Sequence, residues 1–442
     1  MQTKATAIKK VLESKGIKFT YFQFVDLNGQ FYSGTIPTER FESSAEGIGI
    51  DGYSCGFLEV EKSDLIIKPD FETMRILPWE TSTGKIATFL CDMYYADGNT
   101  PYPLDPRNIL KTAVKTLKEE MGDKKEFIVS PELQFWVIEK KNSTWELLDE
   151  ARYFSAPPND RGAEFRQELA VALAEAGIPT DKSHHENTPG KLELNIDHGE
   201  ALKVADTMIQ YKFIVKNLAA QRGLTISFMP KPFNDRPGNG MHFHQNIAEN
   251  GKNLFSDPNS KYFNLSNMAL SYIAGLLKHA SALVAITNPT VNSYKRFHQL
   301  KGTEAPSYIL WAQYNRTSLI RVPPSSAKAA RFEFRGGDGS INPYLGFAAF
   351  LMAGLDGIKN KLTPPEPVEE NVHTLSPELR KKKKIGDLPW NFAEALDELE
   401  KDEVMKRTLG PAFQRYLFLK RKDWREYGRV VTDWEFQKYL DV

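Results

Sequence analysis

The chain has 442 residues, of which 41% are hydrophobic and 26% charged, a balance typical of a soluble globular protein and enough chain for two domains. Lys and Arg together number 57, as do Asp and Glu, so the formal net charge is zero and predicts neither nucleic-acid nor membrane partners. The two cysteines, Cys55 and Cys91, exclude a disulfide framework and favour a reducing cytoplasm.

The first hundred residues favour a small domain built mainly from strands. A helix is predicted over residues 5–15, and the polar residues 26–29 are typical of a β-hairpin turn. Strands are predicted over residues 19–25, 30–36, 65–68, 74–77 and 87–92.

Residues 47–52 match the pattern G-x-G-x-x-G. A dinucleotide-binding turn of this kind must follow a strand and open a helix. Here residues 39–46 favour a helix or loop, and residues 53–60 favour a strand. We therefore interpret the glycines as shaping a turn. The sequence also lacks a Walker-type phosphate loop, so any bound ATP must be held by another device.

Prolines 101, 103 and 106 mark a domain boundary, which we place between residues 1–103 and 104–442. A helix follows the boundary and is predicted to end near Met121. Strands then alternate with long helices, which are predicted over residues 162–176, 199–222, 264–286 and 343–360.

The longest apolar stretch, residues 268–286, contains Lys278 and His279 and is predicted to be a buried helix, not a membrane span. The basic run at residues 380–384 is short and isolated, so we interpret it as a solvated loop.

Four short segments place charged or polar side chains at every second position. Because positions i and i+2 of a strand face the same side, each segment turns its polar groups one way and its Leu or Phe residues the other. Four such strands carrying Glu, His and Arg indicate a sheet wrapped around a polar, ligand-filled cavity. The segments are residues 132–134, 191–195, 242–244 and 331–335.

The acidic residues on or beside these strands indicate a metal site. Carboxylate oxygens suit hard cations such as Mg²⁺ and Mn²⁺, and Mn²⁺ also accepts imidazole. Burying so many carboxylates without cations would cost several kcal/mol per ion. The alternative is an open sheet whose acidic groups face water. The candidates are Glu132, Glu186, Glu193, His242 and Glu333.

Arginines form a second candidate group. Guanidinium groups grip carboxylates and phosphates with two hydrogen bonds, and phosphoryl transfer needs such clamps. The alternative is a set of surface salt bridges of little energetic value. The arginines are Arg296, Arg316, Arg321, Arg331 and Arg335, with Lys295 and Lys328 beside them.

Taken together, these motifs resemble the glutamine synthetase family, type I, over essentially the whole chain. Many independent motifs in one order make the resemblance specific. The matching segments are residues 51–54, 131–135, 184–186, 189–193, 228–232, 240–244, 292–296, 304–306, 331–335 and 342–344.

The resemblance implies an α+β fold, with an N-terminal β-grasp domain and a large C-terminal catalytic domain. In the latter an antiparallel sheet curves around the active site, flanked by helices. It also implies a homo-oligomer of stacked rings, such as a dodecamer, with active sites at subunit interfaces. The implied reaction is the ATP-dependent phosphorylation of the γ-carboxylate of glutamate, followed by attack of ammonia to give glutamine, ADP and phosphate.

The resemblance further implies residue roles. The ligands of the divalent ion nearer ATP match Glu132, His242 and Glu333, and those of the ion nearer glutamate match Gln134, Glu186 and Glu193. The arginine that stabilises the transferring phosphoryl group matches Arg316, and the other nucleotide-phosphate contacts match Arg321, Lys328 and His244. The glutamate contacts match Gly238, Arg296 and Arg335.

Two acidic residues complete the resemblance. Glu304 resembles the flap glutamate that contacts the substrate, shields the intermediate and takes a proton. Asp51, arriving from a neighbouring subunit, resembles the residue that binds and deprotonates ammonium.

The chain departs from the family pattern at several positions. Gln134 stands where the family has a metal-ligating glutamate, Lys191 where it has glutamine, and Pro237 where it has an asparagine. The segment between Glu186 and Glu193 is one residue shorter than usual, and the flap segment 297–303 is two residues longer.

The first two departures make the pocket more positive by two charges, the charge of one divalent ion. Our hypothesis is that Lys191 partly replaces the glutamate-side ion, which leaves one firmly bound ion instead of two. The alternative is that Gln134 ligates through its amide oxygen and Lys191 points elsewhere.

Three functions stay open at this stage. The first is glutamine formation from ammonia, which the presence of Asp51 favours. The second is the same chemistry on an organic amine, such as a polyamine or methylamine. The third is a catalytically weak, nucleotide-binding regulator.

Overall fold

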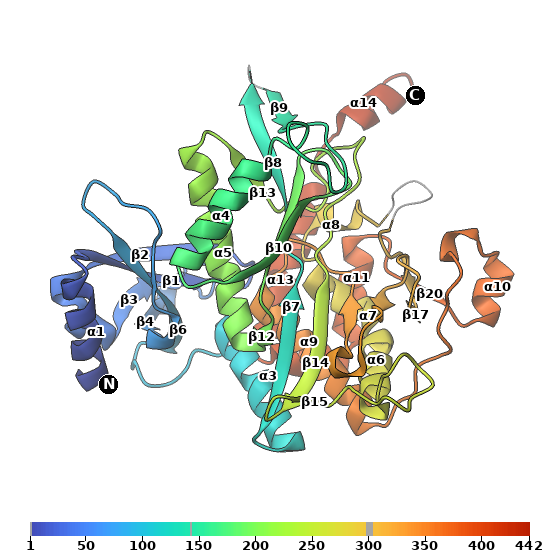
Figure 1. Ribbon diagram of the computed structural model, residues 1–442, viewed down its shortest axis with the longest axis horizontal. Helices are drawn as coiled ribbons and strands as arrows, with labels where there is room; N and C mark the ends of the chain where they lie inside the picture. The colour runs from blue at the N-terminus through green and yellow to red at the C-terminus, as the bar shows by residue number, and fades with distance from the viewer. Residues whose placement is uncertain (1, 142–143, 298–303) are drawn as a thin grey trace.

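The computed structural model describes residues 2–141, 144–297 and 304–442, which form a small N-terminal domain beside a larger C-terminal one (Figure 1). Most of the predicted flap segment, residues 298–303, lies outside the described residues. The elements of the N-terminal domain are α1 (Gln2–Ser14), β1 (Phe19–Val25), β2 (Phe31–Pro37), α2 (Phe41–Ala45), β3 (Ile48–Asp51), β4 (Asp64–Pro69), β5 (Arg75–Ile76) and β6 (Ile86–Tyr95).

The N-terminal domain is a mixed sheet covered by helices. Its strand order is β2-β1-β6-β4-β3, with β5 also paired to β6. Strands β1 and β6 are parallel, and the other pairs are antiparallel. Alternating apolar residues of β1 and β6 meet the first residue of α2, so that Phe22, Phe41 and Phe89 form a buried aromatic cluster. The expected β-grasp domain is therefore confirmed.

The strand expected over residues 53–60 is wrong, because the strand in this region is β3 and it ends at Asp51. The Asp51 carboxylate accepts hydrogen bonds from the backbone N–H of Tyr53 at 3.0 Å and from the hydroxyl of Ser54 at 2.5 Å. An aspartate that binds the backbone two residues ahead forms a turn, and this turn ends the strand. The G-x-G-x-x-G match therefore spans a strand and a turn, not the opening of a helix.

The C-terminal domain begins after the proline-rich segment, with α3 at Pro106. The boundary between residues 103 and 104 stays a prediction. The first elements are α3 (Pro106–Met121), β7 (Lys125–Pro131), β8 (Gln134–Lys141), β9 (Thr144–Leu147), α4 (Ala163–Glu175), β10 (Thr180–His185), β11 (Lys191–Ile196), β12 (Gly199–Glu200), α5 (Ala201–Gln221), β13 (Thr225–Ser227), β14 (Phe243–Glu249) and β15 (Lys252–Asn253).

The second half of the domain is mainly helical. Its elements are α6 (Asn267–Lys278), α7 (Ala280–Thr287), α8 (Val291–Tyr294), β16 (Tyr308–Ile309), β17 (Trp311–Ala312), β18 (Ile320–Arg321), β19 (Phe332–Phe334), α9 (Pro343–Lys359), α10 (Pro377–Lys382), β20 (Gly386–Asp387), α11 (Phe392–Lys401), α12 (Glu403–Leu409), α13 (Ala412–Tyr427) and α14 (Asp433–Tyr439).

Two sheets of the C-terminal domain together form one continuous wall. One has the order β10-β11-β8-β13 and the other β12-β7-β14-β19-β18-β17. They join where β7 passes through Glu132 and Leu133 into β8. Helices α3, α5 and α9 lie behind this wall (Figure 1). The expected curved, mostly antiparallel sheet with flanking helices is confirmed, although it is built from two sheets.

The helix expected over residues 264–286 is two helices. Helix α6 ends at Lys278, and α7 starts at Ala280 after a bend of 77°. His279 lies at the bend, where its ring nitrogens contact Asp402 at 2.6 Å and Asp356 at 3.0 Å. Among the described residues no single helix is long and apolar enough to cross a membrane, and only this bent pair meets that criterion when its two helices are combined.

The two domains meet at the buried guanidinium of Arg107, in the first turn of α3. It contacts Asp70 at 2.7 Å and Asp92 at 2.6 Å in the N-terminal domain. It also forms a two-pronged pair with Asp206 of α5, at 2.9 and 2.8 Å. One side chain therefore connects the N-terminal sheet to α5, a helix that lies behind the two sheets of the C-terminal domain.

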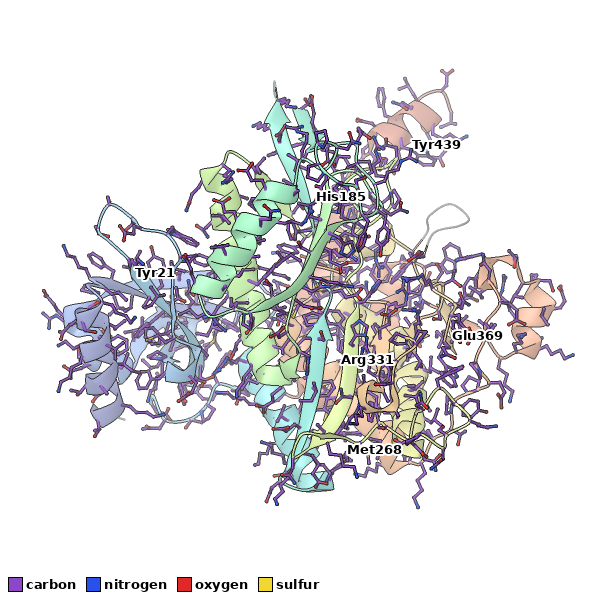
Figure 2. The ribbon with its side chains drawn as sticks, viewed as in Figure 1. Tyr21, His185, Met268, Arg331, Glu369 and Tyr439 are labelled. Atoms are coloured by element: carbon purple, nitrogen blue, oxygen red, sulfur yellow. The ribbon has the colours of Figure 1, made fainter. Side chains whose placement is uncertain are left out.

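The C-terminal end of the chain stands out from the body. Helix α14 projects at the upper right of Figure 1, and Figure 2 labels Tyr439 on it. Large apolar side chains are exposed on this segment: Val430, Val431, Trp434, Phe436, Tyr439 and Leu440.

Replacing Arg107 by methionine leaves the buried Asp206 without a cationic partner, so that only the hydroxyl of Tyr344 still donates to it. We therefore expect the free energy of unfolding to fall by about 3–5 kcal/mol. Lys111→Met is the matched control, because Lys111 contacts Asp92 from a more exposed position and its loss should cost about 1 kcal/mol or less. Denaturant titrations of both variants measure the difference. Equal stability of the two variants would contradict a central role for Arg107.

Candidate active site

A single cavity of about 1220 Å³ opens between the two sheets. It is lined by every predicted site residue except Asp51 and Lys295: Glu132, Gln134, Glu186, Glu193, Gly238, His242, His244, Arg296, Glu304, Arg316, Arg321, Lys328, Glu333 and Arg335. Arg331 and Pro237 line it too. The expected convergence of distant motifs on one polar cavity is therefore confirmed.

Strand register explains how the polar groups meet. Directly opposed residues on neighbouring antiparallel strands point to the same face of a sheet. On the larger sheet His244 is opposite Glu333, which is in turn opposite Arg321. On the smaller sheet Glu193 lies between Gln134 and His184. The cavity is thus lined by two rows of side chains, each running across the strands.

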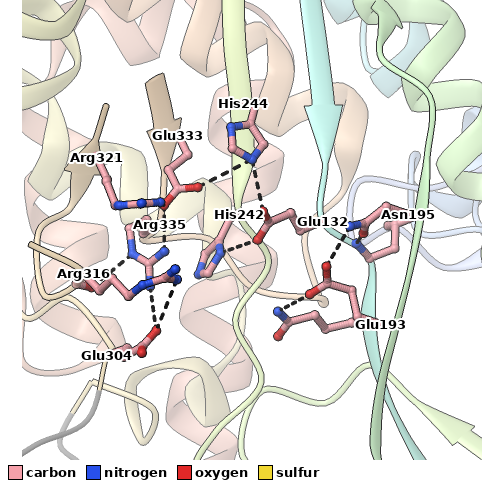
Figure 3. Close-up of polar contacts among 12 residues, drawn as sticks. Glu132, Glu193, Asn195, His242, His244, Glu304, Arg316, Arg321, Glu333 and Arg335 are labelled. Atoms are coloured by element: carbon pink, nitrogen blue, oxygen red, sulfur yellow. Dashed lines mark hydrogen bonds and ion pairs between the residues drawn. The ribbon is translucent and has the colours of Figure 1, made fainter. Parts of the chain in front are cut away.

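The first row leads to a cluster of two carboxylates and two imidazoles (Figure 3). One oxygen of Glu132 is 2.6 Å from His242 Nδ1, and the other is 3.1 Å from His244 Nε2. His244 Nε2 is also 3.5 Å from an oxygen of Glu333. Ligand atoms of Glu132, His244 and Glu333 lie within 4.8 Å of one another. Two carboxylates and an imidazole fit Mg²⁺ or Mn²⁺.

The charges in this cluster compensate one another. Burial acts to raise the pKa of Glu132, but the hydrogen bonds and charges of His242 and His244 hold it well below its usual range. Burial opposes ionisation of Glu333 as well, yet Arg335 and the two histidines lower its pKa to about 2. Both groups are therefore carboxylates at neutral pH, the form that binds a metal ion or pairs with arginine.

Arginines surround the other side of Glu333 (Figure 3). Arg335, which is only 1% exposed, contacts one Glu333 oxygen at 2.7 Å, and Arg321 contacts the same oxygen at 3.1 Å. Arg335 also reaches Glu304 at 3.3 Å, and Arg316 lies 4.0 Å from the same oxygen. A reading of these arginines as surface salt bridges alone is therefore wrong for Arg335.

The second row forms a cluster around Glu193. Its oxygens accept hydrogen bonds from the side-chain amides of Gln134 at 2.8 Å and Asn195 at 2.7 Å. Burial, together with the nearby charges of Glu132 and Glu186, raises the pKa of Glu193 to about 7. The carboxyl groups of Glu132, Glu186 and Glu193 therefore lie close enough together for their negative charges to repel one another.

Lys191 lies inside this cluster. Its ammonium is 3.6 Å from Glu186, whose other oxygen is 3.1 Å from His184 Nε2. Burial raises the pKa of Glu186, but His184 and Lys191 outweigh burial and lower it to about 2. The alternative in which Lys191 points away from the cavity is wrong.

The acidic residues do not face open water. Glu193 and Glu333 are 3% and 2% exposed, so the alternative of an open sheet with solvated carboxylates is excluded for both. Asp51 behaves differently, since it is exposed on β3 and lies outside the cavity. The hydrogen bond from the Ser54 hydroxyl lowers the pKa of Asp51.

Neither His184 nor Asn195 has a predicted individual role, although both contact acidic residues of the second row. The contacts of His184 depend on the pairing of β10 with β11, which local patterns do not reveal. Asn195 lies on the same strand face as Glu193, as the alternation over residues 191–195 predicts. The individual roles of the site residues stay predictions.

Comparisons with known proteins agree over nearly the whole chain. A family model described as the glutamine synthetase β-grasp domain matches residues 16–96, and one described as the glutamine synthetase catalytic domain matches residues 103–439.

Individual relatives are similar over their full length. A glutamine synthetase of Methanocaldococcus jannaschii is 44% identical over 97% of this chain and 96% of its own. One of Methanococcus voltae is 41% identical over 99% of this chain and 100% of its own. A solved structure titled as a GmaS/ADP complex has a TM-score of 0.89 at 30% identity, covering 98% of this chain and 99% of that one.

Divalent cations should stabilise the protein if the carboxylate clusters bind them. With Mn²⁺ at about 100 times its dissociation constant, we expect the free energy of unfolding to rise by about 2.7 kcal/mol per site. Glu333→Gln should remove much of this gain, whereas Glu146→Gln on the exposed strand β9 should leave it intact. Thermal melts with and without Mn²⁺ test this. Equal gains in both variants would contradict a metal site at Glu333.

Proposed function

Because this chain belongs to the glutamine synthetase family, we propose that it catalyses ATP-dependent formation of glutamine from glutamate and ammonia. The γ-carboxylate of glutamate is phosphorylated, and ammonia then displaces phosphate to form the carbon–nitrogen bond. One observation carries the proposal: two carboxylate clusters and a set of arginines line the same cavity. Phosphoryl transfer between two anionic substrates needs that combination of cation sites and guanidinium clamps.

We assign the ATP-side ion to Glu132, His242 and Glu333, with His244 beside them. The family implies ATP and a divalent ion, and these donors suit Mg²⁺ or Mn²⁺. When bound, such an ion neutralises charge on the phosphate oxygens. The histidines hold the two oxygens of Glu132 in a fixed orientation, so the carboxylate is preorganised.

The arginines divide between the two substrates. Arg316, with Arg321, Lys328 and His244, is assigned to the ATP phosphates. Arg316 is 54% exposed on its side chain and can therefore move toward a transferring phosphoryl group. Arg296 and Arg335, with Gly238, are assigned to glutamate. Arg335 is held by Glu333, so its outer nitrogen is positioned for a substrate carboxylate.

Two acidic residues are assigned to proton handling. The Glu304 side chain is 62% exposed at the cavity mouth, where it can cover the acyl phosphate and exclude water. Asp51 is assigned to binding ammonium and accepting its proton. Because Asp51 lies outside the cavity of its own chain, it would have to come from a neighbouring copy.

We infer one firmly bound ion and a weaker second one. Lys191 carries a positive charge 3.6 Å from Glu186, and Gln134 donates its amide hydrogen to Glu193 instead of adding a carboxylate. Both features reduce the attraction for a hard cation on the glutamate side.

We propose a homo-oligomer of stacked rings, because the cavity lacks Asp51 in one chain and because apolar side chains are exposed at the C-terminal end.

We place the enzyme in the cytoplasm, which supplies ATP and keeps Cys55 and Cys91 reduced. Both cysteines are free thiols in the fold.

An organic amine is the second candidate nucleophile. Tyr153 lines the cavity and is 57% exposed, and Phe154 beside it is 61% exposed. These rings offer an apolar surface near Glu186, which an N-substituent could contact and ammonia could not.

Phosphate release from ATP and glutamate distinguishes the candidates. We expect release with ammonia, and we expect Arg316→Ala to lower kcat by about 1,000-fold. Arg222→Ala is the control, because Arg222 is an exposed arginine just after α5 that does not line the cavity. Release only with methylamine or a polyamine would favour the second candidate. ATP binding without any release would favour a regulator.

Mixed oligomers test whether the active site is shared. Asp51→Asn and Arg335→Ala should each abolish activity alone. Dissociated and remixed, they should regain about a quarter of the wild-type activity, because random mixing pairs an intact cavity with an intact neighbouring Asp51 at about that frequency. Remixed oligomers with no recovered activity would place Asp51 in the site of its own chain or in none.

A further inference from the structure

Residues 51–59, which we call the Asp51 segment, are held together by their own backbone. Beyond the end of β3 these described residues form turns, with no further strand or α-helix. The N–H of Cys55 donates to the carbonyl of Asp51 at 3.3 Å. The N–H of Phe57 donates to the carbonyl of Gly52 at 2.8 Å. The position of the Asp51 carboxylate therefore depends on what holds the whole segment.

Helix α13 of the catalytic domain holds the Asp51 segment through Arg415. The Nε of Arg415 donates to the carbonyl of Gly56 at 2.9 Å, and a terminal nitrogen of the same guanidinium contacts the carboxylate of Glu59 at 3.0 Å. The planar guanidinium presents its donors in a fixed fork, so both partners are held in one orientation. The Glu59 side chain is 75% exposed, so we expect the bond to Gly56 to contribute more than the ion pair.

The inner side of the segment has a different support. Phe57 is 3% exposed and meets the ring of Tyr102 edge-on, with 5.8 Å between the ring centres. The Tyr102 hydroxyl also donates to the carbonyl of Phe57 at 3.3 Å. Because Tyr102 precedes α3, this contact attaches the segment to the end of the N-terminal domain. Arg415 instead attaches it to the domain that contains the cavity.

Helix α13 carries a second arginine, which contacts the catalytic domain itself. Arg421 lies 2.7 Å from Asp397 and 2.6 Å from Glu400, both on α11. The Arg421 side chain is 30% exposed, close to the 22% of Arg415. The two arginines therefore match in residue type, helix and exposure, and of the two it is Arg415 that contacts the Asp51 segment.

We propose that Arg415 is a positioning residue for the ammonium step, because it fixes the Asp51 segment to the catalytic domain and so sets where the Asp51 carboxylate lies. Arg415 does not line the cavity and acts through the segment. The inference rests on the proposed function, in which Asp51 binds ammonium and accepts its proton at a neighbouring cavity. Binding of ATP and glutamate uses residues of the cavity itself and should not depend on Arg415.

Steady-state phosphate release by the intact oligomer, with each substrate varied in turn, tests this role. Arg415→Met should lower kcat/KM for ammonium by about 10–100-fold, because a small displacement of a reacting group is enough for such a loss. The KM values for ATP and glutamate should stay at their wild-type values. Arg421→Met is the matched control and should leave the use of all three substrates unchanged. Arg415→Lys should restore part of the loss, since a lysine ammonium can still donate to the carbonyl of Gly56.

The pH dependence separates a misplaced Asp51 from a general loosening of the fold. Free ammonia already lacks the proton that Asp51 would accept, and its share of the total increases with pH. The deficit of Arg415→Met relative to the wild type should therefore shrink as pH rises. A higher pH should not repair a deficit that a loosened fold causes.

Hydrogen exchange of backbone amides tests the anchoring without any measurement of activity. In Arg415→Met the amides of the Asp51 segment, such as that of Phe57, should exchange faster than in the wild type. Arg421→Met should leave them unchanged. The amides of the neighbouring strand β4 are the internal reference and should exchange at the wild-type rate in both variants.

Two results would overturn the proposal. One is unchanged exchange in the Asp51 segment of Arg415→Met, and the other is an equal loss for all three substrates in that variant. Failure of the ligase proposal is distinguishable, because the wild type would then release no phosphate with ammonia. Faster exchange in Arg415→Met would in that case confirm the anchoring and overturn its role in ammonium capture.

Discussion

Carboxylates held inside one cavity dominate the physics of this protein, because each must be matched by a positive charge or a hydrogen-bond donor. Around Glu333 the protein supplies the compensation itself, through Arg321 and Arg335. Around Glu193 it does so only in part, through two neutral amides. The arginines beside Glu333 can therefore also bind anionic ligands, whereas the negative charge of Glu193 is only partly compensated by the protein.

The two sheets deliver part of the site directly, and the loops and strand ends beside them deliver the rest. The residues on strands are Gln134, Glu193, His244, Arg321 and Glu333. Opposed positions on paired strands bring residues far apart in the sequence, such as His244 and Glu333, within reach of each other. The opposite faces of the same strands carry buried Phe243, Phe332 and Phe334, which anchor the wall on the helices behind it. The rigid wall limits how far the ligand atoms can drift, which a metal site requires.

Alternation of polar and apolar residues predicted a polar cavity and the strand residues that line it, such as Glu193 and Glu333, whereas Gly238 and Glu304 were predicted only by the resemblance to the glutamine synthetase family. What alternation cannot give is which strand lies beside which. The contact of His184 with Glu193 follows from the pairing of β10 with β11, and this pairing is a tertiary property. The break between α6 and α7 is accompanied by contacts of His279 with two aspartates that lie far away in the sequence, and local patterns do not reveal such contacts. The end of β3 is different, because the Asp51 carboxylate binds residues two and three positions ahead and forms a local turn.

The position of Arg107 has a consequence for the assembly. It fixes the N-terminal domain to the catalytic domain of its own chain, while Asp51 at the edge of that domain is proposed to complete a neighbour's cavity. A subunit with a loosened junction would then keep its own substrate pocket and misplace the ammonium ligand of the next one. In a closed ring, activity would therefore be lost in the neighbouring subunit and not in the subunit whose junction is loosened.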